Sequence, residues 1–208
     1  MIHDKILIAL GLTIALAGCM DTEAMEEDGL ESESAQSDHV RAERARGDFC
    51  VIDGFDAETL RCFADDREAA AVATSGALVL NPDGSEPDPE TMRRMIEDTH
   101  APGVGATQDA QAIVYTHAIF YSLSYWTGAK LYMTKTSKTF CTDGGVGYIA
   151  DLADVGFDNR ISSLRLYNGC YCTLYQLKDF EGALAGWDSS DAVLPIWWNN
   201  RASSLDVY

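Results

Sequence analysis

The chain has 208 residues and a net charge of −18, because 33 acidic residues face only 15 lysines and arginines. This balance argues against a nucleic-acid partner, since binding to the phosphate backbone needs clustered Lys and Arg. An acidic surface is instead typical of an exported protein that must stay soluble.

The first nineteen residues predict a targeting segment. Lys5 precedes an apolar run over residues 6–16 that is too short to span a bilayer comfortably. The run ends in Leu-Ala-Gly-Cys, which resembles a bacterial lipobox and implies that Cys19 becomes the lipidated first residue. An attached lipid anchors a protein to a membrane without spanning it, and Met20 favours the outer membrane. An ordinary secretory signal, with a secreted product, is the alternative.

Residues 20–47 predict a disordered acidic tether. They hold nine acids, three arginines and almost no large apolar side chain. Such a segment cannot bury enough surface to offset the entropy lost on ordering.

Residues 48–110 predict a small α+β module. A short strand is expected over residues 49–52, and a strand end at residues 62–63. An Ala-rich helix should begin at an N-cap among Asp65 and Asp66 and stop at Ser75-Gly76. After a second apolar run over residues 77–80, Asp88-Pro89 should cap another helix whose Met92, Met95 and Ile96 share one face.

Residues 111–208 predict two tandem units, because two different motifs each occur twice. The first motif reads DNRISS at residues 158–163 and NNRASS at residues 199–204, and each copy opens an apolar alternation. The second motif has two aromatics and a glycine at fixed spacing: Tyr121, Trp126 and Gly128, then Tyr175, Phe180 and Gly182. We place the repeats at about residues 111–167 and 168–208.

The two motifs together resemble the βγ-crystallin family, most closely its bacterial, secreted, calcium-binding members, with a distant similarity to crystallin-like proteinase inhibitors. The resemblance implies an all-β fold, a double Greek-key sandwich, in which the aromatic motif forms a folded hairpin in each repeat. Gly128 and Gly182 would then lie where a side chain cannot. Ser163 and Ser204 would hold these hairpins.

The resemblance also implies Ca²⁺ at the DNRISS and NNRASS turns, hereafter the two clamps. Calcium takes six to eight hard oxygen ligands, and the clamps offer carboxylate, amide, hydroxyl and main-chain oxygens. Each ion would lie between the repeats and draw on both clamps. The acidic or amide places belong to Asp158, Asn159, Asn199 and Asn200, the hydroxyl places to Ser162 and Ser203, and main-chain oxygens come from Arg160 and Arg201. The alternative is that the clamps are strand-entry turns without metal, because Asn, Asp and Ser dominate such turns.

The cysteines predict disulfides, because an exported chain meets an oxidising environment. Sequence order suggests Cys50 with Cys62, and Cys141 with either Cys170 or Cys172. The last two flank Tyr171 and would face the same side of a strand, so the choice stays open. A zinc site is the rival interpretation, but no paired CxxC spacing supports it.

Nothing in the sequence predicts an enzyme. His3, His39, His100 and His117 are scattered, with no HxxxH pair or nucleophile elbow near them. Two functions remain open: a calcium-binding, surface-anchored structural module of the cell envelope, and an inhibitor of an extracellular metalloprotease. The long connection over residues 134–156 would be the inhibitory loop.

Overall fold

The computed structural model describes residues 38–98, apart from residue 40, and residues 113–208. The targeting segment with Cys19, most of the tether, His3 and His100 lie outside the described residues. Within the described part, no helix has the length and apolar character needed to cross a membrane.

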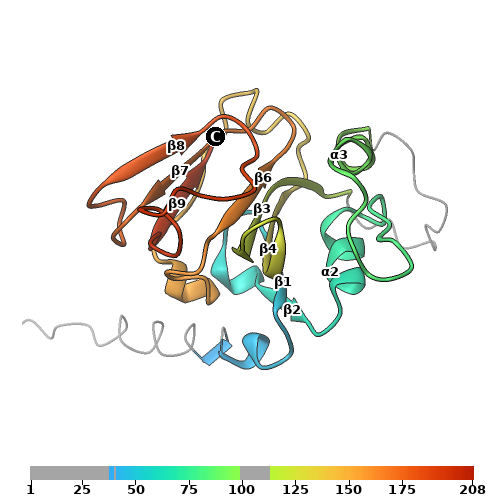
Figure 1. Ribbon diagram of the computed structural model, residues 1–208, viewed down its shortest axis with the longest axis horizontal. Helices are drawn as coiled ribbons and strands as arrows, with labels where there is room; N and C mark the ends of the chain where they lie inside the picture. Colours follow the sequence, from blue (N-terminus) through green and yellow to red (C-terminus); the bar gives the residue numbers. More distant parts are fainter. Residues whose placement is uncertain (1–37, 40, 99–112) are drawn as a thin grey trace, which may run out of the picture.

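Two sheets form the body of the protein (Figure 1). The larger sheet has the strand order β2-β1-β4-β3-β6 and the smaller one β5-β9-β7-β8. The strands are β1 (Phe49–Asp53), β2 (Arg61–Phe63), β3 (Tyr115–Leu123), β4 (Thr127–Lys135), β5 (Gly147–Ile149), β6 (Ser163–Leu166), β7 (Cys172–Tyr175), β8 (Leu184–Trp187) and β9 (Ser204–Val207). Side chains of both sheets share one core, which includes Phe120 and Leu131 from the larger sheet and Leu174 and Leu205 from the smaller.

The strand order confirms the predicted double Greek-key sandwich. In each repeat the last strand returns beside the first, so that β6 pairs with β3 and β9 pairs with β7. The segment that follows the second strand of each repeat crosses to the other sheet. In the first repeat this segment is β5, which pairs with β9 of the second; in the second repeat it is reduced to an isolated bridge between Asp191 and Leu164 of the first. The two repeats therefore share their sheets.

The segment before the first repeat, the predicted small α+β module over residues 48–110, adds two strands to the larger sheet. β1 pairs in parallel with β4, with Cys50 opposite Leu131, and antiparallel with β2. This pairing gives β4 a partner on its outer edge. The helix η1 (Ala57–Thr59) connects β1 to β2, and η2 (Leu152–Val155) follows β5.

Two helices cover the outer face of the larger sheet (Figure 1). They are α2 (Asp66–Ala73), capped by Asp65, and α3 (Pro89–Glu97), capped by Asp88, and both caps are at the predicted positions. Because both faces are covered, β3 is buried on each: Ala118 and Phe120 enter the sandwich core, whereas Ile119 and Tyr121 enter a second core with the helices. The apolar run at residues 77–80 is not a strand, yet Leu78 and Leu80 pack into this second core.

A buried charge network joins this covering layer to the sheet. The Lys130 Nζ atom lies 2.5 Å from Asp66 Oδ2 and 2.6 Å from Glu86 Oε1, and the other oxygen of Glu86 meets Arg165 Nη2 at 3.2 Å. The hydroxyls of Tyr121 and Tyr132 donate to Glu86 and Asp66. The network is neutral as a whole and is almost closed to water.

Part of the predicted tether, which was expected to reach residue 47, is folded. The described residues between 38 and 44 are helical, and the side chain of Glu43 is buried. Its Oε2 atom accepts the Cys62 main-chain N–H at 3.0 Å, and the Arg44 guanidinium lies over the Phe157 ring. Charge composition suggested disorder here, but two of the charged side chains find buried partners.

Candidate metal centre between the two repeats

The two clamps share a left-handed second residue and are hydrogen-bonded to each other. Asn159 and Asn200, the second residues of the clamps, have φ of 52° and 56°, in the left-handed region that asparagine tolerates. The Asn159 N–H donates to Ala202 O at 2.9 Å, and the Asn200 N–H donates to Ile161 O at 2.8 Å. The clamps are thus related by an approximate two-fold axis that passes between the repeats.

One hydroxyl place collects oxygen atoms from both repeats. Ser162 Oγ lies 2.9 Å from Asn199 Oδ1, 3.0 Å from Asn200 Oδ1 and 3.1 Å from Ser122 O. A serine hydroxyl carries one hydrogen, so it can donate to only one of these three acceptors. If either asparagine side chain were rotated by 180°, its amide N–H would replace its oxygen next to the Ser162 hydroxyl. With both amide oxygens inward, the cluster has the composition of a hard-cation site.

The other half of the centre holds the only carboxylate of the clamps, Asp158. Its Oδ1 atom is buried and has no hydrogen-bond partner among the described residues, while Oδ2 accepts the Asn159 amide N–H at 2.9 Å. Ser203 holds the place equivalent to Ser162. The Ser203 N–H donates to Tyr175 O and the Ser162 N–H donates to Tyr121 O, both at 2.9 Å, and these tyrosines are the equivalent first aromatics of the two hairpin motifs. A buried carboxylate oxygen without a partner is costly, and a bound cation would remove that cost. These donors therefore fit Ca²⁺.

The clamp arginines keep their side chains away from these oxygens. Arg160 Nη1 donates to Gly156 O at 3.0 Å, and its guanidinium lies over the Phe157 ring. The Arg201 side chain is exposed. Main-chain oxygens are thus what these two residues can offer to an ion.

The serines that end the clamps hold the folded hairpins. Ser163 Oγ donates to Leu123 O at 2.7 Å and accepts the Trp126 N–H at 3.1 Å. Ser204 Oγ donates to Leu177 O at 2.6 Å and accepts the Phe180 N–H at 3.1 Å. Each clamp is therefore tied to its own hairpin on one side and faces the opposite clamp on the other.

Four of the five described cysteines form two disulfides. Cys50 is bonded to Cys62 and Cys141 to Cys170, which leaves Cys172 as a buried free thiol. Burial, and then the nearby Asp206, raise the pKa of Cys172 well above its usual value. This thiol is therefore protonated and unreactive at neutral pH.

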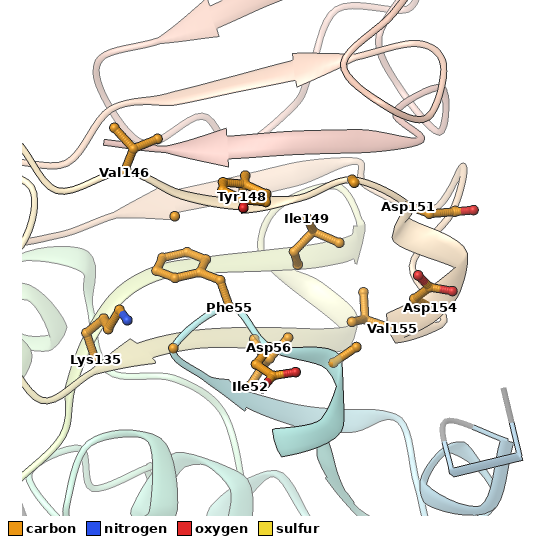
Figure 2. A pocket seen from close by; sticks show the side chains of 14 residues that line it. Ile52, Phe55, Asp56, Lys135, Val146, Tyr148, Ile149, Asp151, Asp154 and Val155 are labelled. Atoms are coloured by element: carbon orange, nitrogen blue, oxygen red, sulfur yellow. The ribbon is translucent and has the colours of Figure 1, made fainter. Parts of the chain in front are cut away.

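A separate cleft of about 390 Å³ lies between residues 52–57 and the β5–η2 segment. Figure 2 shows Phe55 and Tyr148 on opposite walls, with Asp151 and Asp154 near η2. Asp56 and Asp151 each accept a main-chain N–H as helix caps, at 3.0 and 2.9 Å. Two of the acidic side chains in this cleft thus have structural partners.

Comparison with known proteins finds similarity only among solved structures. No protein-family model and no curated protein matches the chain. A βγ-crystallin domain from Flavobacterium johnsoniae is 28% identical, with a TM-score of 0.34, over 44% of this chain and 92% of that domain. A βγ-crystallin domain from Clostridium beijerinckii is 17% identical, with a TM-score of 0.36, over 44% and 97%. The N-terminal domain of Protein S is 22% identical, with a TM-score of 0.37, over 44% and 94%.

Proposed function

We propose that this protein is a calcium-binding structural module of the cell envelope, with the ions held between its two Greek-key repeats. The observation that carries the proposal is the cluster of three oxygens around Ser162 Oγ, which share a single hydrogen. The buried, unpartnered Oδ1 of Asp158 supports a second ion at the two-fold-related place. Carboxylate, amide, hydroxyl and main-chain oxygens are the ligands that Ca²⁺ uses.

Binding should be weak, because Asp158 is the only carboxylate in the two clamps and the equivalent places are neutral amides. Calcium affinity depends on ligand charge and on the rigidity of the site, and extracellular modules have Kd of about 10⁻⁴ to 10⁻³ M. An ion that binds only the folded form stabilises it by RT ln(1 + [L]/Kd). At about one hundred times Kd this is roughly 2.7 kcal/mol, or several degrees in melting temperature.

The test is a calcium titration of the purified protein, followed by calorimetry and thermal melting. Wild-type protein should release or absorb heat and melt several degrees higher in calcium. The double variant Ser162→Arg with Ser203→Arg should lose both effects, because each arginine puts a cation where a hydroxyl ligand stood. Ala183→Arg with Ser189→Arg adds the same charge at exposed places and should keep both effects. Wild-type protein that shows neither heat nor a shift would mean that the clamps are metal-free turns.

We further propose that the protein is exported and anchored by a lipid on Cys19, most simply in the outer membrane. The support is the Leu-Ala-Gly-Cys sequence at the end of the apolar run. Cys19→Ala should leave the precursor unprocessed and without lipid. Metabolic labelling with palmitate checks this, and label retained by the variant would contradict it.

We do not extend the proposal to protease inhibition, because the connection over residues 134–156 is fixed by a disulfide, a strand pairing and two buried side chains. Cys141 is bonded to Cys170, β5 pairs with β9, and Leu152 and Val155 are fully buried.

A further inference from the structure

A second cluster of potential metal ligands lies away from the clamps, in the core beside β3. His117, Cys141 and Cys170 come from three separate stretches of the chain, and all three are buried. Their ligand atoms, one imidazole nitrogen and two sulfurs, lie within 4.8 Å of one another. This is the only such group among the described residues. Spacing alone does not single out these three residues, because no two of them are separated as the ligands of a zinc motif usually are.

The hydrogen bonds of His117 determine which ring nitrogen faces the sulfurs. Nε2 lies 2.9 Å from the Ser137 carbonyl oxygen, which can only accept, so Nε2 carries the proton. Burial lowers the pKa of His117, against the opposing effect of this hydrogen bond. Nδ1 therefore presents its lone pair to Cys170 Sγ at 3.3 Å. A disulfide sulfur has no proton to offer, so Nδ1 has no donor there while the bridge is intact.

This arrangement matches the way a protein prepares a histidine to bind a metal. A ligating histidine usually donates its other ring N–H to a main-chain carbonyl or carboxylate, which fixes both the tautomer and the ring orientation. Two thiolates and one imidazole are the ligands of Cys₂His zinc sites, with water in the fourth place. Thiolate and imidazole donors also distinguish this place from the clamps, which offer only oxygen.

We propose that His117, Cys141 and Cys170 form a binding site for Zn²⁺, or for a similar thiophilic cation, whenever the Cys141–Cys170 disulfide is reduced. A dithiol reductant gives two electrons and two protons to the S–S bond and becomes a disulfide itself. The two new thiols release their protons as the thiolates bind the ion, and Nδ1 supplies the third ligand. The same two sulfurs thus serve either the disulfide or the metal, never both, so the thiol redox state of the surroundings selects between them.

The other disulfide lacks these features and provides an internal control. Beside Cys50 stands a permanent cation, since Arg44 Nη1 lies 3.2 Å from the Cys50 Sγ atom. A guanidinium cannot bind a metal, and its charge opposes one. Reduction of Cys50–Cys62 should therefore create no metal site.

The experiment uses Co²⁺ as a spectroscopic substitute for Zn²⁺, on protein reduced by a phosphine without oxygen. Excess Ca²⁺ is present so that the clamps do not take up cobalt. Reduced wild-type protein should bind one cobalt ion with strong thiolate-to-cobalt absorption in the near ultraviolet, and Zn²⁺ should displace it. Oxidised protein should show no such absorption.

Variants assign the ligands. Cys141→Ser should abolish the absorption, and His117→Asn should weaken cobalt binding by at least tenfold. The matched control, Cys50→Ser with Cys62→Ser, should bind as wild type does, and so should Cys172→Ala. The proposal is overturned if reduced wild-type protein binds no cobalt, if binding survives in the His117 and Cys141 variants, or if Cys172→Ala abolishes it.

A second measurement tests the proposal if reduction of the disulfides unfolds the protein. If the reduced protein is unfolded without metal, added Zn²⁺ should restore its circular dichroism, because a metal that binds only the folded form stabilises it. Reduced protein that stays unfolded in excess Zn²⁺ would also overturn the proposal.

Discussion

Gly128 and Gly182 occupy equivalent turns in the two hairpins, and each combines two constraints. Their φ angles are +82° and +78°, which disfavour any residue with a Cβ. The space is also filled: a Cβ on Gly128 would lie 2.5 Å from Ser122 Oγ and 2.9 Å from Leu123 Cγ. A Cβ on Gly182 would lie 3.0 Å from Leu177 Cγ. The steric constraint is therefore tighter in the first repeat.

Gly128→Ala should destabilise the protein by about 2–4 kcal/mol, since it adds a clash to the backbone strain. Gly84→Ala is the matched control, because Gly84 has φ of +84° and no atom within 4 Å of its Cβ position. This substitution should lower the free energy of unfolding only by the backbone strain, about 1–2 kcal/mol. Urea denaturation measures both, and equal losses would show that the crowding at Gly128 has no effect.

At this scale the sequence identified the clamp residues but not their surroundings. The pattern of Asn, Asp and Ser is local, so spacing alone marked residues 158–163 and 199–204. The carbonyl of Ser122 and the inward orientation of the two amides depend on contacts between distant segments. The choice between Cys170 and Cys172 was open because both were placed in one strand. In the structure β7 begins at Cys172, and Cys170 lies in the turn before it.

At the scale of elements, the covering layer of α2 and α3 is held to the sheet by Lys130. Only 5% of this residue is exposed, and it pairs with Asp66 and Glu86, which come from two different segments; Arg165 supplies the second positive charge at Glu86. Buried ion pairs add little net stability compared with apolar packing. Removal of one partner is nevertheless expensive, because the remaining charge has no compensation.

Lys130→Met should therefore lower the free energy of unfolding by about 3–5 kcal/mol, because it leaves the buried Asp66 without a cation and Glu86 with Arg165 alone. Arg93→Met breaks the exposed ion pair with Glu97 on α3 and should cost less than about 1 kcal/mol. Thermal melting at neutral pH compares the two variants. Similar losses in both would mean that water reaches the Lys130 network.

The elements that the sequence predicted well are those with local signals. Asp65 and Asp88 cap α2 and α3 through main-chain N–H groups two or three residues further on, and such caps can be recognised in any sequence. The parallel pairing of β1 with β4 has no local signal, because its partners are far apart in the chain. The prediction of a small α+β module over residues 48–110 therefore did not include this pairing.

For the whole molecule, the segment before the repeats is part of the folded body. Ile119, Tyr121 and Tyr132 are fully buried beneath the covering layer, on the side of the sheet that faces away from the sandwich core. A fragment of residues 111–208 would expose these side chains and the edge of β4. Exposed apolar patches and unpaired strand edges both favour association.

We expect this fragment to melt at a lower temperature than a chain that begins at residue 38, and to bind a hydrophobic dye that the longer chain does not bind. The reason is the loss of the second core together with the β1–β4 pairing. Calorimetry and dye fluorescence on the two proteins provide the measurement. Equal melting temperatures without dye binding would show that the repeats are complete without the preceding segment.

The pairing of β5 with β9, and the bridge from Asp191 to Leu164, also indicate how a two-repeat chain could arise from a single repeat. A single repeat with this topology lacks a partner for its third strand, so it is complete only when a second copy supplies one. In a protein of one repeat, that copy would come from another molecule, as a two-fold symmetric pair. Duplication within one gene joins the two repeats in one chain, so that they associate within the molecule at an effective concentration set by the linker. Assembly of the two halves then no longer depends on how much protein the cell makes.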